Sequence, residues 1–76
     1  MVQVALSSLR PREKGRVVSI AGGLGVARRL MEIGVLPGEV VEVLSNSFGP
    51  VVIRTRGVTF ALGRGLASKV LVEVVS

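Results

Sequence analysis

The sequence lacks the side chains on which most active sites and metal centres depend. Its 76 residues include no cysteine, no histidine and no aspartate, and only five glutamates. A disulfide framework, a thiolate or imidazole metal site and a histidine general base are therefore excluded. The glutamates are scattered along the chain, whereas sites for hard cations draw on several carboxylates together. We expect a protein that is not an enzyme and that holds no metal or cofactor.

Aromatic residues are scarce as well. Tryptophan and tyrosine are absent, and the two phenylalanines are Phe48 and Phe60. Grooves that bind proline-rich peptides are lined with aromatic rings, and small barrels that bind nucleic acids stack bases on such rings. We place Phe60 in the core by strand parity and Phe48 in a loop. An acidic or apolar protein surface is therefore the expected partner.

The chain is both basic and apolar. Ten lysines and arginines give it a net charge of +5, and 49% of its residues are hydrophobic. The charge could attract nucleic acid, anionic lipid or an acidic protein, or it could simply keep an apolar chain soluble. The longest uncharged stretches, 17–27 and 43–53, have 11 residues each, whereas a spanning helix needs about 20. We expect a cytoplasmic protein without a secretory signal.

Strands are expected to dominate the structure, because 16 of the residues are valines and β-branched side chains pack well on a pleated surface. No linker or repeat divides residues 1–76, which we treat as one domain. Alternation places Val51, Ile53 and Thr55 on one strand face, with Arg54 and Arg56 on the other. The expected strands are 16–21, 39–44, 51–56, 58–62 and 70–75.

The last of these strands is apolar on both faces. We expect Val70, Val72 and Val74 to point into the core, which leaves Leu71 and Val75 outside. An exposed apolar pair of this kind could form a contact with a partner or with a second copy of the chain. Scattered exposed apolar residues are also normal on a monomer, so the oligomeric state stays open.

One segment has helical periodicity instead. Leu24, Ala27, Leu30 and Met31 recur at spacings of three and four, which places them on one helical face. We expect Leu30 and Met31 to fill the core. A shorter helical turn is expected at residues 66–68. Together the segments predict a mainly β fold, a small antiparallel β-barrel with one inserted α-helix and a short helical turn.

The opposite face of this helix is charged. It carries Arg28, Arg29 and Glu32, and Arg28 lies four residues before Glu32, a spacing at which the two can pair. These side chains could be solvated or could contact a partner, since arginine is a frequent anchor of interfaces. The glycine-rich stretch 22–25 before the helix does not match a phosphate-binding loop, so direct nucleotide binding is not expected.

Turn residues mark the ends of these elements. Gly34 suits the left-handed residue that closes a helix, and Pro37 with Gly38 is typical of a turn. Gly57 separates two strands that we expect to form a hairpin. The residues with expected structural roles are Leu30, Gly34, Pro37, Gly38 and Gly57.

The order of short motifs carries a further indication. The matching pieces are Leu6–Leu9, residues 15–18, residues 28–38, residues 41–43, Gly49-Pro50, Gly57, Ala61-Leu62 and Ala67. In this order they resemble the ferrous-iron transport protein A family, FeoA. The sequence departs from the family pattern after Leu62, where the segment Gly63-Arg64-Gly65 carries fewer charges than family members often have there.

The resemblance implies a Src-homology-3-like barrel that serves as a small cytoplasmic accessory protein of iron uptake. In the FeoA family the usual partner is FeoB, a membrane permease for Fe²⁺ with a cytosolic GTP-binding domain. We therefore expect a protein–protein contact. The candidate partner-binding residues are Arg28, Arg29, Glu32, Arg54, Arg56 and Leu71.

A nucleic-acid-binding barrel remains the alternative. Arg54 and Arg56 would form a basic stripe suited to phosphates, although the missing aromatic platform counts against it. Such binding would weaken steeply with salt, because neutralised phosphates release counterions.

Overall fold

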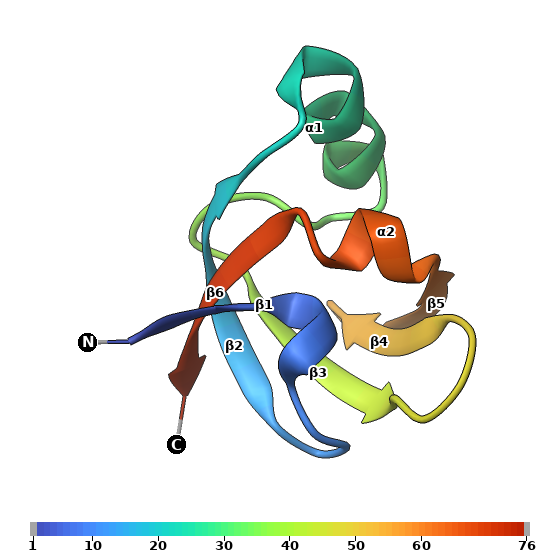
Figure 1. Ribbon diagram of the computed structural model, residues 1–76. Coiled ribbons are helices and arrows are strands. Elements are labelled where there is room, and N and C mark those ends of the chain that lie inside the picture. Colours follow the sequence, from blue (N-terminus) through green and yellow to red (C-terminus); the bar gives the residue numbers. More distant parts are fainter. Residues whose placement is uncertain (1, 76) are drawn as a thin grey trace.

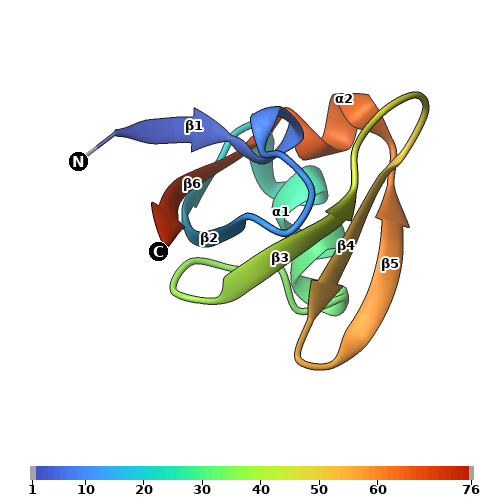
Figure 2. The same ribbon diagram turned by 90° about the horizontal axis from the view of Figure 1, so that it is seen from below.

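One curled antiparallel sheet forms the body of the protein. The computed structural model describes residues 2–75, and its strands are hydrogen-bonded in the order β1-β6-β2-β3-β4-β5 (Figures 1 and 2). The elements are β1 (Gln3–Ala5), the 3-10 turn η1 (Leu6–Ser8), β2 (Lys14–Ile20), α1 (Gly23–Glu32), β3 (Val40–Ser45), β4 (Val51–Thr55), β5 (Val58–Leu62), α2 (Arg64–Ala67) and β6 (Val70–Val75).

The predicted fold class is confirmed, and the structure has one strand, β1, beyond the five that were expected. The sequence does not predict β1, because this strand has three residues and no alternation of its own. It forms by pairing with β6 at the far end of the chain, where Val4 lies opposite Val72. The first predicted strand also begins earlier, at Lys14, and ends at Ile20.

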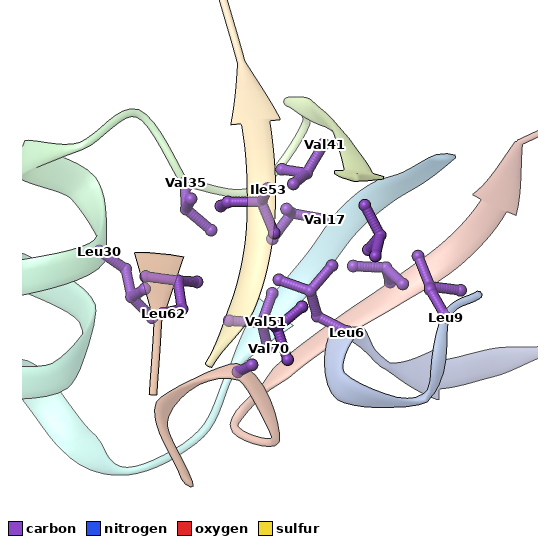
Figure 3. Packing of buried hydrophobic residues seen from close by; sticks show 13 residues of the cluster. Leu6, Leu9, Val17, Leu30, Val35, Val41, Val51, Ile53, Leu62 and Val70 are labelled. Carbon is purple, nitrogen blue, oxygen red and sulfur yellow. The ribbon is translucent and has the colours of Figure 1, made fainter. Parts of the chain in front are cut away.

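The core lies inside the curl of the sheet (Figure 3). Alternation along β4 is confirmed, because Val51, Ile53 and Thr55 are all buried. Val74 is a correction, since it is half exposed. It lies opposite Gly15, which has no side chain to cover it. The buried hydrophobic residues are Leu6, Leu9, Val17, Leu30, Val35, Val41, Val43, Val51, Ile53, Leu62, Ala67, Val70 and Val72.

Helix α1 contacts this core with a different face from the one predicted, and Leu24 is 73% exposed. Leu30 is its one fully buried side chain and lies beside Leu62 (Figure 3). The expectation that Met31 fills the core is wrong, because its side chain is 55% exposed. Val26 and Ile33 pack against the core instead. They lie four residues before and three after Leu30, so the buried face is rotated about the helix axis.

The end of α1 is built as predicted. Gly34 has a φ of 92° and its N–H donates to the carbonyl of Met31, while the N–H of Val35 donates to Leu30. These two bonds form a Schellman motif, which requires a left-handed residue. The turn at Pro37 and Gly38 is also confirmed, with Gly38 at a φ of 96°.

Helix α2 lies beside η1 across the open side of the sheet (Figure 1). It begins at Arg64, two residues before the predicted helical turn. The Arg64 guanidinium donates to the side-chain oxygen of Asn46, and the Asn46 amide donates to the carbonyls of Ser7 and Leu9. The glycine-flanked arginine thus ties α2 to the β3–β4 loop and to the residues around η1.

Candidate partner-binding surface

The arginines of the β4–β5 hairpin are neutralised by glutamates. Arg54 lies opposite Glu42 on the neighbouring strand, and its guanidinium is 3.0 Å from the carboxylate. Arg56 reaches Glu39 at 2.5 Å. The hydrogen bond from Arg56 lowers the pKa of Glu39 below its ordinary value, and the same bond raises the pKa of Arg56. The register of the sheet therefore leaves no free basic stripe on these two residues.

Arg56 does not lie on the strand, contrary to the prediction. β4 ends at Thr55, and Arg56 with Gly57 forms a two-residue turn in which both residues have positive φ, 53° and 79°. This is the geometry of a type I′ hairpin. Gly57 therefore has the structural role expected of it, and Arg56 occupies the turn beside it.

The arginines of α1 are in a different state. Arg28 and Arg29 are exposed on the helix. Within residues 2–75, the only ion pairs are those of Arg54 and Arg56, so the predicted pair of Arg28 with Glu32 does not form. The two helix arginines therefore present their charges to solvent.

A groove runs between α1 and β5, and we call it the α1–β5 groove. It consists of two hollows, of about 430 and 280 Å³. They share Glu32, Ile33 and Phe60 as lining residues. The first hollow is also lined by Arg29, Ala61, Leu62, Gly63 and Leu66. The second is also lined by Met31, Gly34, Thr55, Arg56 and Val58.

The groove brings together half of the predicted site residues. Arg29, Glu32 and Arg56 line it, whereas Arg28 and Arg54 do not line either hollow. Leu71 is half-buried on β6, a strand enclosed between β1 and β2, and is not the exposed residue that we expected. Phe48 is 95% exposed in its loop, and Phe60 is partly buried against the core, as predicted.

Sequence reasoning missed the apolar part of the groove. Met31 and Val58, which are 55% and 52% exposed, line one hollow together with Phe60. The helical spacing predicts Met31 in the core, and the strand pattern predicts Val58 only as part of a hairpin. No local signal in the sequence identifies this edge, because β6 follows β5 along the chain and only the sheet order shows that β6 pairs elsewhere.

Two further observations concern metal and membrane. Across residues 2–75, no three metal-ligating side chains of the histidine, cysteine, aspartate or glutamate type come together. In the same range there is no helix with the length and apolar character needed to cross a bilayer.

Solved structures place the fold in the class of SH3-like domains. An iron uptake regulatory protein, FeoA, superposes with a TM-score of 0.91 and 41% identity, covering 99% of this chain and 100% of that one. FeoA from Stenotrophomonas maltophilia, solved with zinc and described as an SH3 domain protein, gives a TM-score of 0.81 and 28% identity over 92% of this chain and 89% of that one.

Sequence comparison identifies the family. The FeoA domain matches residues 4–74. A candidate Fe(2+) transport protein A of Methanocaldococcus jannaschii is 40% identical over 68 residues, which is 90% of this chain and 83% of that protein. The chain belongs to the FeoA domain family, and the resemblance inferred from the motifs is confirmed.

Proposed function

We propose that this protein is a cytoplasmic accessory protein of ferrous-iron uptake that binds a cytosolic face of a FeoB-type permease. Family membership over residues 4–74 supports the iron-uptake role, and the relatives named for iron uptake or Fe(2+) transport cover nearly the whole chain. The observation that supports the binding surface is that Arg28 and Arg29 are exposed on α1 without an ion pair among the described residues, with Arg29 lining the α1–β5 groove.

The role is one of binding rather than catalysis. A bound protein shifts the equilibrium of its partner only by its difference in affinity between the partner's states. An accessory domain of this kind would therefore act by preferring one conformation of the permease. Exposed arginines suit such a contact, because the guanidinium pairs with carboxylates in a planar, bidentate geometry.

Capture from membranes tests this role. The tagged protein is incubated with nuclease-treated, detergent-solubilised membranes of its own host, and the bound proteins are identified by mass spectrometry. Recovery of a GTP-binding iron permease is the expected result. Recovery of ribosomal or other nucleic-acid-binding proteins without a permease would contradict the proposal.

The two arginines proposed to bind phosphates in the nucleic-acid alternative are already engaged. Arg54 and Arg56, its principal residues, are each paired with a glutamate, so phosphates would have to displace carboxylates already in contact. No binding to single- or double-stranded DNA or RNA in low salt is the outcome we expect.

A further inference from the structure

The outer edge of β5 lacks the features that usually protect an edge strand. The sheet order ends in β1 on one side and β5 on the other, and Figure 2 shows β5 at the outer end of the sheet. β1 has three residues, whereas β5 has five, with no proline, no charged residue and no bulge in its pairing with β4. Proteins usually shield edges by shortness, charge, proline or bulges. β5 is therefore open to pairing with another strand.

The hairpin geometry identifies the main-chain groups that face outward. Thr55 and Val58 flank the two-residue turn and lie opposite each other. Such a closing pair is hydrogen-bonded, and the pairs alternate along an antiparallel ladder. The N–H and C=O groups of Thr59 and Ala61 consequently point away from β4. Within residues 2–75, no other strand or turn supplies hydrogen bonds to these groups.

The α1–β5 groove lies directly beside this edge. Ala61 lines its first hollow, and the floor is formed by the partly buried side chains of Ile33, Phe60 and Leu66. In an extended chain every second side chain points to the same face. A segment paired with Thr59 and Ala61 would therefore place alternate side chains on this apolar floor.

We propose that the β5 edge binds an extended segment of a partner protein as an added strand, with apolar residues at alternate positions and an acidic residue near Arg29. Main-chain pairing supplies affinity and the groove supplies selectivity, as in other cases of strand addition. The unpaired charge of Arg29 favours the carboxylate. A second copy of this chain is disfavoured, because each copy carries a net charge of +5. Only the identification of the partner with the permease rests on the proposed function.

Nuclear magnetic resonance with synthetic peptides tests the edge without the permease. The ¹⁵N-labelled protein is titrated with end-capped peptides of about seven residues, alternating threonine with valine, leucine or phenylalanine and ending in glutamate. Amide exchange at Thr59 and Ala61 is expected to slow about tenfold at saturation. The inference is overturned if no peptide protects these amides, if the shifts centre elsewhere, or if the amides are already protected by self-association.

Backbone variants separate strand addition from side-chain contact. Thr59→Pro removes an outward N–H at an edge position where proline is tolerated, and Thr59→Val keeps that N–H. We expect the first variant to lose peptide binding and the second to retain it. Peptides N-methylated on alternate amides provide the same test on the unaltered protein: methylation of the set that faces β5 should abolish binding. Equal binding of both methylated sets would refute main-chain pairing.

The solubilised permease distinguishes the two proposals. Capture by the unaltered protein and by Thr59→Val, but not by Thr59→Pro, would support both. Equal capture by all three would leave the proposed function in place and remove the β5 edge from the interface. If none captures the permease while the peptides still protect Thr59 and Ala61, the proposed function fails and the edge site stands.

Discussion

Two pairs of arginines on this small domain have opposite surroundings. Arg54 and Arg56, on the β4–β5 hairpin, are each held by a glutamate of the β3 region. Arg28 and Arg29, on α1, form no ion pair with any residue from 2 to 75. The pairing of β4 with β3 and the hairpin turn bring Arg54 and Arg56 against Glu42 and Glu39, whereas α1 brings none of the described glutamates within ion-pair distance of Arg28 or Arg29. Of these two pairs of arginines, the pair on the helix is therefore the one whose charge is available to a partner.

Truncating the anchor of α1 should have the largest effect. Leu30→Ala removes the helix's only fully buried side chain and should lower the free energy of unfolding by about 3 kcal/mol, since the lost contacts leave a cavity. The difference between the two arginine pairs would then be lost, because the helix that carries Arg28 and Arg29 would no longer be packed against the sheet. Urea unfolding measures the change. Met31→Ala is the control and should cost under about 0.5 kcal/mol at its exposed position. Equal losses of unfolding free energy in the two variants would mean that Met31 is buried with Leu30, as the helical spacing predicts.

The left-handed end of α1 gives the next effect. Gly34→Ala should destabilise the protein by about 1 kcal/mol or more, because an L-residue is strained at a φ of 92°. The nearest atoms to the added Cβ lie 3.7 Å away, so crowding contributes little. Gly25→Ala, within the helix and with open space around its Cβ, should instead stabilise by about 0.5–1 kcal/mol. Thermal unfolding should show a lower midpoint for Gly34→Ala and a higher midpoint for Gly25→Ala. A lower midpoint in both variants would contradict the assigned helix end.

A buried hydroxyl in the hairpin gives a smaller effect of the opposite sign. Thr55 is buried, and its Oγ1 has no hydrogen-bond partner among the described residues. Thr55→Val should therefore raise the free energy of unfolding by about 1 kcal/mol, because an unsatisfied buried polar group is costly. Thr59→Val, at an exposed position of the same hairpin, should change it little. A marked destabilisation by Thr55→Val would show that the hydroxyl has a partner.

The smallest effect concerns the ion pair at the hairpin turn. Arg56 lowers the pKa of Glu39, so the pair contributes stability above the ordinary glutamate pKa and loses it as the pH falls through the lowered value. The contribution is small, since both side chains are solvent-accessible. Glu39→Gln should flatten the acid limb of the stability profile slightly. Titration of the Glu39 carboxyl carbon by NMR should show the lowered pKa, and Arg56→Gln should bring it back to the ordinary value.

Local patterns were sufficient for much of the fold. The inward face of β4, the end of α1 at Gly34 and the turn at Pro37 and Gly38 each follow from the chemistry of a few adjacent residues. The face of α1 did not, because Leu30 belongs to two overlapping apolar stripes, one through Met31 and one through Val26 and Ile33. Only packing against the sheet selects between them.

The candidate surface depended more on long-range geometry. The charged residues Arg29 and Glu32 could be identified from the helical period. The ion pairs of Arg54 and Arg56 could not, because they depend on strand register and on a turn that takes Arg56 off the strand. The open edge of β5 also requires the sheet order, and that order is set by the pairing of β6 with β1 and β2.

The most direct measurement compares the two arginine pairs in binding to the purified, detergent-solubilised permease of the host. Arg28→Gln with Arg29→Gln, and Arg54→Gln with Arg56→Gln, each remove two positive charges, so their net charges match. We predict that the helix pair weakens binding about tenfold, or about 1.4 kcal/mol, while the hairpin pair leaves it within about twofold. Equal weakening by both double variants would show that binding depends only on net charge. A larger loss of affinity from the hairpin variant would contradict the assignment of the contact to the helix.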